Sequence, residues 1–396
     1  MLNLLLSIFV LGLIITIHEC GHFLLAKLFG VGVVEFSIGM GPTVLSRVWG
    51  NTRYSLRMLP FGGSCMMVGE EAEENGLPAS GEESGESEGS STAADAAPDG
   101  DWFEIDGRRY GKAEQFVEKA AWKRFLIIAA GPCFNFLLAF LLSLVITAQA
   151  GVDRPIVMQV EAGMPAAEAG VTEQDLVTRI GIAGKGNSRI RTSRDLMLYL
   201  TVHAKELNEK KMVLLWLRGD AGSDAERVVK LQPRYAESTG TYRLGLSYNS
   251  AYLPANGFGE LVGFSAHNVV YCINSTIQSL KLLVRGDVGR QDVMGPVRMV
   301  ATMDETVSEA ADYGFVTAAL TLMNLVILIS GSLGAMNLLP IPALDGGRLF
   351  FILIELVARR PVPRELEGRI HAIGMALLLT LMVFILFNDV SMLLAG

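Results

Sequence analysis

The sequence predicts a polytopic α-helical membrane protein with about four transmembrane helices, a small membrane-associated β-sheet and an inserted α+β domain. Hydrophobic residues make up 51% of the 396 residues, and the mean hydropathy is +0.38. Such values are typical of membrane proteins. Four apolar runs are long enough to cross a bilayer, and short β-patterned segments lie between them. The net charge of -8 argues against a nucleic-acid partner.

The four apolar runs are the predicted transmembrane helices, because each comes close to the roughly 20 residues that span a bilayer. They cover residues 2–29, 125–150, about 315–339 and 370–387. The first run lacks a basic n-region and a small-residue cleavage site, so we expect it to be retained rather than removed as a signal peptide. Arginine and lysine are concentrated after the first and third runs. These segments are therefore predicted to be cytoplasmic, which places residues 151–312 outside the cytoplasm.

A small β-sheet is predicted after the first run. The candidate strands are residues 33–36, 43–49, 52–59 and 64–68. Gly50 and Asn51 form a two-residue turn between the middle pair. Residues 69–101 are rich in Glu, Ser, Gly and Ala and have almost no aromatic residues. This stretch cannot bury enough apolar surface to become ordered, so we expect a disordered cytoplasmic insertion.

The external region begins with short strands that alternate with a helix near residues 193–203. This order, together with the segment from Met164 to Val171, resembles a PDZ domain over residues 152–248. No clear carboxylate-binding loop of the Gly-Φ-Gly-Φ type stands out. Residues 258–284 then repeat apolar side chains at helical spacing. They predict an amphipathic helix on the outer face of the membrane.

His18, Glu19 and His22 form an HExxH motif in the first apolar run. On a helix the two histidines lie one turn apart on one face and can share a metal ion. Glu19 is about 100° around the helix from His18, close enough to reach a metal-bound water as general base. The motif alone recurs by chance, but a charge at the centre of a span costs at least about 2.5 kcal/mol. The location of the motif therefore favours a functional site.

Catalytic zinc needs three protein ligands and an open position, so a third ligand must come from elsewhere in the chain. Asp345 is the best candidate, because it lies in residues 337–347, where two prolines interrupt regular helix and two glycines allow close packing. Two histidines and a carboxylate could also hold iron or cobalt. His203, His267 and His371 have no partner motif nearby and are assigned no role.

Five motifs occur in the order typical of one protein family. They are the HExxH motif, Leu59-Pro-Phe-Gly-Gly63, Gly131-Pro-Cys-Phe-Asn135, Met294-Gly-Pro-Val297 and the segment from Asn337 to Gly347. With these motifs the chain resembles the bacterial site-2 proteases of the regulator-of-sigma type, which are intramembrane zinc metalloproteases with a PDZ domain. The resemblance implies that His18, His22 and Asp345 bind Zn²⁺. It also implies that Glu19 activates a zinc-bound water and that Asn337 helps to hold an unwound substrate.

The resemblance also gives the small sheet a role, since in this family the sheet dips into the membrane as a re-entrant loop. A strand edge at Phe61, Gly62 and Gly63 would bind the substrate by strand addition. An ordinary turn is the alternative for this tripeptide. Gly131 and Asn135 are expected to pack spans together or to make polar contacts between them.

The implied activity is hydrolysis of peptide bonds within transmembrane segments, the site-2 cleavage of regulated intramembrane proteolysis. Single-span membrane proteins would be the substrates, for example anti-sigma factors or remnant signal peptides. The implied location is the bacterial cell membrane, where the multi-pass chain contacts the lipid bilayer. The PDZ domain would be extracytoplasmic and would screen substrates already cut by another protease, whereas the acidic insertion would be cytoplasmic.

These inferences divide the chain into nine segments. The first five are a transmembrane helix with HExxH (1–30), a re-entrant sheet (31–68), the acidic insertion (69–101), a cytoplasmic segment with the second transmembrane helix (102–150) and the PDZ domain (152–248). The remaining four are an amphipathic extracytoplasmic region (256–312), the third transmembrane helix with the LDGG motif (315–347), a cytoplasmic loop (348–369) and the fourth transmembrane helix (370–390).

Two other functions compete with proteolysis. A membrane scaffold or chaperone derived from a degenerate protease would keep the spans and the PDZ domain, but the intact HExxH motif and Asp345 argue against it. A metal or ion transporter would place His and Asp residues along a permeation path. Transporters usually contain inverted repeats, and none is seen in the sequence. A soluble-type zinc protease with a membrane anchor is excluded, because the HExxH motif lies within the span.

Overall fold

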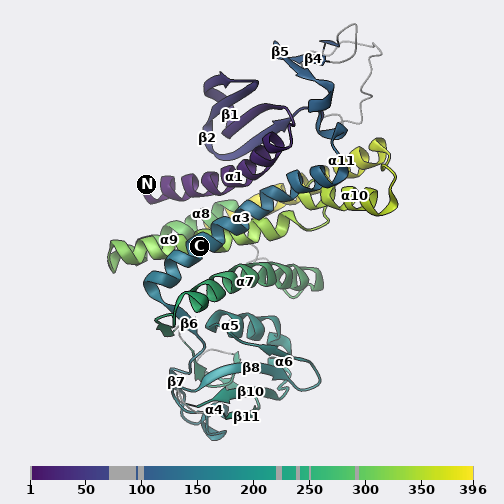
Figure 1. Ribbon diagram of the computed structural model, residues 1–396. Coiled ribbons are helices and arrows are strands. Elements are labelled where there is room, and N and C mark those ends of the chain that lie inside the picture. Colours follow the sequence, from purple (N-terminus) through teal and green to yellow (C-terminus); the bar gives the residue numbers. More distant parts are fainter. Residues whose placement is uncertain are drawn as a thin grey trace. The chain divides into compact units, whose positions relative to one another are not determined.

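The structure is a computed structural model that describes residues 2–70, 95–96, 102–219, 225–237, 241–248, 251–289 and 294–395 (Figure 1). Most of these residues are helical, and the strands form small sheets. The chain divides into two compact units, residues 1–142 with 288–396 and residues 143–287. The HExxH motif and Asp345 belong to the first unit, and the range predicted as a PDZ domain, residues 152–248, lies within the second.

Four helices are long and apolar enough to cross a membrane, which confirms the prediction of a multi-pass helical architecture at this level. They are α1 (Leu2–Leu28), α3 (Ala121–Ala150), α9 (Phe315–Asn337) and α11 (Arg364–Ala395). Large apolar side chains are exposed along α11, for example those of Leu377 and Phe387. Exposed apolar surface of this extent is expected of a helix that faces lipid.

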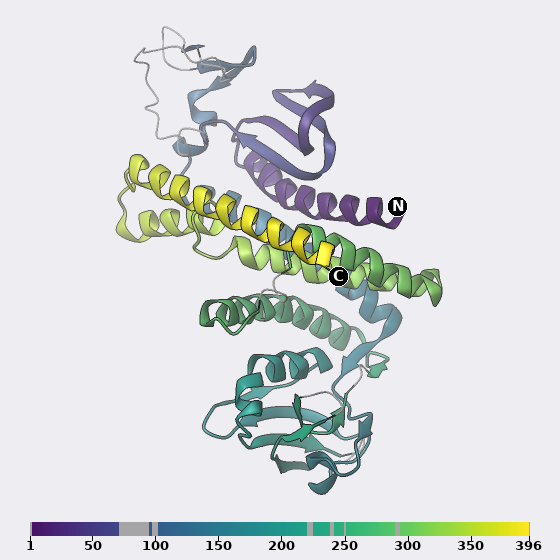
Figure 2. The same ribbon diagram turned by 180° about the vertical axis from the view of Figure 1, so that it is seen from behind.

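The predicted small sheet consists of two long antiparallel strands, β1 (Val33–Trp49) and β2 (Thr52–Met67), beside α1 (Figures 1 and 2). The strands bend back on themselves, so that Phe36 pairs with both Tyr54 and Cys65. Four segments consequently lie side by side in the order 43–49, 52–57, 35–38 and 63–67. The bounds of these four segments are similar to those of the four short strands predicted from the sequence. Among the described residues, 63–67 pair on one side only and form an edge of the sheet.

The tip of this hairpin is apolar and exposed. Gly50 has a φ of 61°, which a glycine adopts without strain, and it forms the tight turn together with Asn51. Next to the turn, the side chains of Val44, Leu45 and Trp49 are all exposed. Contiguous exposed apolar surface of this kind is typical of a membrane or protein contact.

Most of the predicted acidic insertion, residues 69–101, lies outside the described residues, and its disorder stays a prediction. Within it, β3 (Asp95–Ala96) pairs with β4 (Trp102–Ile105), which also pairs with β5 (Arg108–Gly111). Two short 3-10 turns, η1 (Lys112–Glu114) and η2 (Phe116–Glu118), lead from this sheet towards α3.

The helix α8 (Pro296–Asp312) follows the motif Met294-Gly-Pro-Val297. The N-terminus of α8 contacts α11. The carboxylate of Asp389 on α11 accepts hydrogen bonds from the backbone N–H groups of Gly295, at 2.9 Å, and Arg298, at 3.1 Å. A carboxylate at a helix N-terminus satisfies free N–H donors and interacts favourably with the helix dipole. The buried Asp389 thus fixes α8 to the fourth span.

A helix that was not predicted, α10 (Asp345–Ala358), lies between the third and fourth spans and covers the first half of the predicted cytoplasmic loop 348–369. The third span ends at Asn337, and residues 338–344 connect it to α10. On α10, Glu355 accepts two hydrogen bonds from Arg124 of α3, at 2.6 and 2.7 Å. This charge-assisted pair ties α10 to the second span.

The second unit is built around a four-stranded antiparallel sheet in the order β11-β10-β8-β9. These strands are β8 (Leu176–Ile182), β9 (Asn187–Arg189), β10 (Val213–Arg218) and β11 (Glu226–Leu231). The other strands are β6 (Val152–Arg154), β7 (Gln159–Val160), β12 (Arg234–Ala236), β13 (Thr241–Arg243), β14 (Leu246–Ser247) and β15 (Ala251–Leu253). The helices are α4 (Pro165–Glu168), α5 (Ser193–Val202), α6 (Ala204–Asn208) and α7 (Phe258–Arg285). Assignment of these elements to a PDZ domain stays a prediction.

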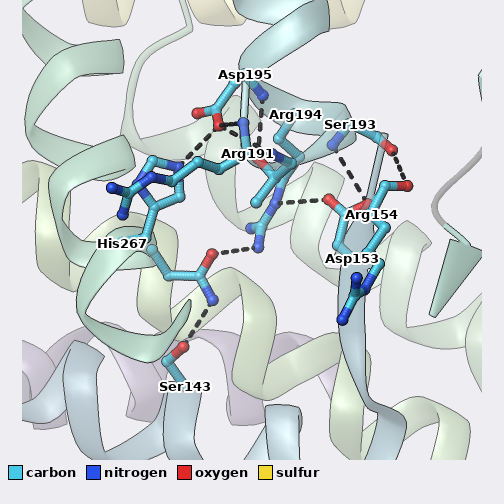
Figure 3. Close-up of polar contacts among 10 residues, drawn as sticks. Ser143, Asp153, Arg154, Arg191, Ser193, Arg194, Asp195 and His267 are labelled. Atoms are coloured by element: carbon cyan, nitrogen blue, oxygen red, sulfur yellow. Dashed lines mark hydrogen bonds and ion pairs between the residues drawn. The ribbon is translucent and has the colours of Figure 1, made fainter. Parts of the chain in front are cut away.

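A polar network joins α5 to α7 within the second unit (Figure 3). The Nε2 atom of His267 on α7 lies 2.8 Å from Oδ2 of Asp195 on α5. The guanidinium of Arg194 donates to Oδ1 of Asn268 at 2.8 Å, and Nδ2 of Asn268 donates to the hydroxyl of Ser143 at 2.7 Å. Because α7 contacts α5 through specific polar pairs, the amphipathic helix belongs to the same compact unit as the sheet.

The Asp195–His267 pair makes this junction sensitive to acid. Burial alone would raise the pKa of Asp195, but hydrogen bonds from His267 and from the backbone N–H groups of Arg191 and Thr192 lower it below its usual value. A depressed carboxyl pKa stabilises the fold fully above the unfolded value of about 3.9 and loses this contribution as the pH falls through the folded value.

We therefore expect the Asp195→Asn variant to lose protection of α5 and α7 amides at neutral pH. Below about pH 4 the difference from the wild type should begin to shrink, and it should vanish once the pH has fallen below the lowered pKa of Asp195. Hydrogen exchange read by mass spectrometry, corrected for the intrinsic pH dependence of exchange, would measure this. Equal protection of variant and wild type at pH 7 would contradict the stabilising role of the pair.

Candidate metal centre

The three side chains proposed as metal ligands converge in the first unit. His18 and His22 are each 6% exposed, and their Nε2 atoms lie 3.3 Å apart, one turn of α1 from each other. Asp345, the first residue of α10, brings its Oδ2 atom to 3.0 Å from Nε2 of His18 and to 3.4 Å from Nε2 of His22. One ligand atom from each residue thus falls within 4.8 Å of the others. Such a group of two histidines and a carboxylate could hold a metal ion, and a catalytic zinc ion with three protein ligands keeps a fourth position for water.

The hydrogen bond of His22 supports metal binding. Its Nδ1 atom lies 2.9 Å from the backbone carbonyl oxygen of Ile127. A carbonyl only accepts, so Nδ1 donates to it, and in the neutral ring Nε2 keeps a lone pair directed towards the carboxylate of Asp345. Two acceptors repel each other unless a cation lies between them, so this neutral tautomer would suit a bound metal ion.

His18 is held from two sides by asparagine side chains. The amide of Asn135, which is completely buried on α3, lies 3.2 Å from Nδ1 of His18. The atom at this distance is Nδ2, which only donates, whereas Oδ1 of the same amide is buried without a hydrogen-bond partner among the described residues. With the amide rotated by 180°, Oδ1 would accept the Nδ1 proton of His18 and orient Nε2 towards a metal. The Nδ2 atom of Asn337, the last residue of α9, lies 3.4 Å from Nε2 of His18. Asn337 is thus beside the metal centre, and the polar contact expected of Asn135 is made with a proposed ligand.

The close approach of α1 and α3 depends on glycine. A Cβ atom on Gly21 would lie 2.4 Å from the carbonyl oxygen of Ala130. A Cβ atom on Gly131 would lie 2.2 Å from Nε2 of His22 and 2.8 Å from Nε2 of His18. Atoms do not approach this closely, so the backbone of α3 forms one wall of the metal centre only because residue 131 has no side chain.

We expect Gly131→Ala to weaken zinc binding by about tenfold or more, the range seen when groups that orient metal ligands are disturbed. The added methyl group would displace the ring of His22. Zinc retained after titration with a chelator measures the effect. Gly263→Ala is the matched control, because a Cβ atom there meets nothing within 4 Å on α7. Wild-type zinc affinity in Gly131→Ala would show that α3 does not form this wall.

A cavity of about 490 Å³ opens beside the proposed ligands and holds the general base proposed from the sequence. Glu19, His22 and Asp345 line it together with the sheet edge 63–67. The other lining residues are Glu70, Ile128, Ala343, Leu344, Arg348, Glu367, His371, Ala372 and Met375. The cavity therefore combines a carboxylate, a candidate metal centre and an exposed strand edge, which are the parts that peptide hydrolysis requires.

The residues proposed to bind substrate differ in their relation to this cavity. Gly63 lines it, and a Cβ atom on Gly63 would lie 3.4 Å from Cγ of Glu19. Gly62 has a φ of 88°, and a Cβ atom there would meet Sδ of Met40 at 2.7 Å, so it shapes the bend before the edge. Of Phe61, the described part is its backbone in β2. Substrate contact by these three residues stays a prediction.

Sequence reasoning missed several residues of the cavity. Arg348 of α10 forms an ion pair with Glu70, and both line the cavity. His371 of α11 lines the cavity as well, although no motif surrounds it. A single histidine inside an apolar span is itself a signal, because ionisable residues there are costly. It could have been recognised on that basis.

Comparison with known proteins identifies the family. The family model for peptidase family M50 matches residues 6–381. A zinc metalloprotease RasP of Bacillus licheniformis is 28% identical over 434 residues, covering 97% of each chain, and the regulator of sigma-W protease RasP of Bacillus subtilis is 28% identical over 436 residues with the same coverage. A protein of Clostridium acetobutylicum, whose name also describes a zinc metalloprotease, is 31% identical over 98% of this chain and 97% of its own. The resemblance to site-2 proteases is thereby confirmed, and the chain belongs to peptidase family M50.

Proposed function

We propose that this chain is an intramembrane zinc metalloprotease that cleaves peptide bonds within transmembrane segments of other membrane proteins. One observation carries the proposal: ligand atoms of His18, His22 and Asp345 converge beside Glu19, on a helix that is apolar and long enough to span a membrane. The ligand set would accept iron or cobalt as well. The zinc metalloprotease names of the relatives favour zinc.

In this proposal His18 Nε2, His22 Nε2 and Asp345 Oδ2 hold the metal. Bound zinc supplies a Lewis acid that polarises a carbonyl and lowers the pKa of water. The carboxylate of Glu19 takes a proton from the attacking water and passes it to the nitrogen of the leaving amine. The amide of Asn337 donates a hydrogen bond to a carbonyl oxygen of the substrate next to His18.

The substrate is proposed to bind as an extended strand. A peptide bond in a helix is hidden by its own hydrogen bonds, so the substrate span must unwind before water can attack. The edge formed by residues 63–67 lines the cavity and pairs on its other side with residues 33–38. Its outer backbone groups can pair with an unwound substrate and hold the scissile bond beside Glu19.

The second unit is proposed to be an extracytoplasmic PDZ domain that screens trimmed substrates. A cavity of about 320 Å³ is lined by Leu200 and Leu207 of the helices and by residues 242–248, which run from β13 to β14. Leu244, Gly245 and Leu246, where the chain passes from β13 to β14, place a glycine between two apolar residues, as peptide-binding loops of the Gly-Φ-Gly-Φ type do. The substrates would be single-span proteins of the bacterial cell membrane, such as anti-sigma factors or remnant signal peptides. The name of the Bacillus subtilis relative, a regulator of sigma-W protease, supports this class.

The test is cleavage of a defined substrate by the full chain purified in detergent or reconstituted in vesicles. Two single-span substrates with identical flanks would be compared, one with helix-breaking residues at the centre of its span and one with a leucine-rich span. We expect cleavage of the first, inside the span, and much slower cleavage of the second. Mass spectrometry locates the cut. Zinc binding without cleavage of either substrate, or cuts confined to the flanks, would reject intramembrane proteolysis.

A further inference from the structure

His371 lies in the wall of the active cavity, and no part of the proposed chemistry uses it. It is 9% exposed, and it comes from α11, whose other side chains are mostly apolar and exposed. An ionisable residue in an apolar span is costly unless it makes specific contacts. The contacts of His371 therefore point to its role.

The imidazole accepts a hydrogen bond from the loop that precedes Asp345. The backbone N–H of Ala343 lies 3.0 Å from Nδ1 of His371. A backbone N–H can only donate, so Nδ1 is unprotonated and the ring proton is on Nε2. On that side Oε1 of Glu367 lies 4.0 Å away, one turn earlier on α11. The ring is thus oriented with its acceptor towards the loop.

Residues 338–344 make a strained turn that needs such support. Ala343 has a φ of 73°, in the left-handed region that is strained for a residue other than glycine. The turn also touches α11 directly, because a Cβ atom on Gly374 would lie 2.3 Å from Cβ of Pro342. Gly374 follows His371 by three residues and shares its face of the helix. The fourth span therefore holds the turn by a hydrogen bond and by close packing.

Two residues after Ala343, the chain places Asp345 at the start of α10, with Oδ2 beside both histidines. Backbone direction at the turn sets the position of this oxygen. Metal–ligand distances tolerate errors of only about 0.2 Å. A turn released at Ala343 would therefore misplace the carboxylate.

We propose that His371 is a positioning residue of the metal centre: its Nδ1 atom holds the left-handed turn at Ala343 and so fixes Asp345 against His18 and His22. The role requires no contact of His371 with metal or substrate. It rests on the proposed metal ligands, and it extends the metal centre to a residue of the fourth span.

Three substitutions separate the hydrogen bond from the bulk of the ring. In His371→Asn, the amide oxygen takes the place of Nδ1 and can accept the Ala343 N–H, whereas His371→Gln places its acceptor one bond further out and His371→Leu has none. Zinc affinity of the full chain would be measured by competition with a chelator. The visible absorption of the cobalt-substituted protein would report the ligand geometry.

We expect His371→Leu and His371→Gln to bind zinc about 10- to 100-fold more weakly, the range for groups that support metal ligands, and to alter the cobalt spectrum. His371→Asn should restore both readouts towards wild type. Ile373→Ala is the matched control on the same turn of α11, because Ile373 is 71% exposed and lines no part of the cavity.

Three other results would each contradict a specific part of the proposal. If Asp345→Ala weakens zinc binding but His371→Leu does not, the positioning role is wrong and the metal ligands stand. If His371→Asn is as defective as His371→Leu, the hydrogen bond to Ala343 is not the cause. If Asp345→Ala itself binds zinc as the wild type does, the proposed metal set fails, and the role of His371 fails with it.

Discussion

The Glu19→Gln variant is expected to bind zinc as the wild type does and to cleave substrates about 10²–10⁴-fold more slowly, the usual contribution of a general base. Glutamine has nearly the shape of glutamate but cannot take a proton from water at neutral pH. Glu19 lies in the cavity beside His22 and Asp345, so its loss removes the proposed base while the three ligands stay in place. Bound zinc and the rate of span cleavage would be measured on the same preparation.

Glu70→Gln is the informative comparison for Glu19→Gln. Glu70 is a second carboxylate in the same cavity, but it is paired with Arg348. We expect its substitution to reduce the rate much less than that of Glu19. If the two variants lose activity equally, the cavity needs negative charge in general, and Glu19 is not a specific base. If Glu19→Gln cleaves at the wild-type rate, another group takes the proton.

The Asp345→Ala variant is expected to lose zinc. Removing a proposed direct ligand should lower the zinc affinity by more than the about 10- to 100-fold that follows from disturbing a supporting group. His18 and His22 would remain as two ligands, too few for a catalytic zinc site. Chelator competition and metal analysis measure the loss, and cleavage should disappear in parallel. Excess zinc should restore some activity if affinity alone is affected.

Asp312→Asn serves as the control for Asp345→Ala. Asp312 is an exposed carboxylate at the end of α8 and belongs to no ion pair or metal group in the described part of the chain. The Asp312→Asn variant should bind zinc and cleave substrate as the wild type does. Undiminished zinc in Asp345→Ala would mean that a different residue is the third ligand.

The features that could be predicted from the sequence depend on bilayer thickness and on local helix geometry. Span length follows from bilayer thickness, so the four apolar helices were predictable from hydropathy alone. The meeting of His18 and His22 follows from the helical repeat. Asp345 could be proposed because helix-breaking prolines and a carboxylate rarely occur together at membrane depth without a role. The structure brings these three side chains together.

Contacts between segments that are far apart in the chain could not be predicted from the sequence. The backbone carbonyl of Ile127 orients His22, and nothing in the sequence distinguishes one carbonyl from another. Similarly, the short strands of the sheet were predictable one by one from their composition. The double pairing of residues 35–38 was not, because it depends on where the long strands bend. His371 acts through Ala343, a neighbour only in the folded protein.

The helix α10 was predicted as a loop for a physical reason. Its apolar residues are too few for a span, and the basic residues around it led to the prediction of a loop between the third and fourth spans. In the structure the segment is helical and is tied to α3 by the Arg124–Glu355 pair. Apolar residues recur at helical spacing in this segment and could have predicted the helix, whereas its pairing with Arg124 of α3 could not be predicted.

The separation of the ligands along the chain has a consequence for biosynthesis. The ribosome makes His18 and His22 with α1, whereas it makes Asp345 only after α9. A nascent or truncated chain that stops before α9 contains the HExxH motif but not the complete ligand set. The newly made polypeptide is therefore expected to stay inert while its early spans enter the membrane among other nascent proteins. Proteolytic competence would arise only once α10 has been made and its Asp345 has joined the two histidines in the proposed metal centre.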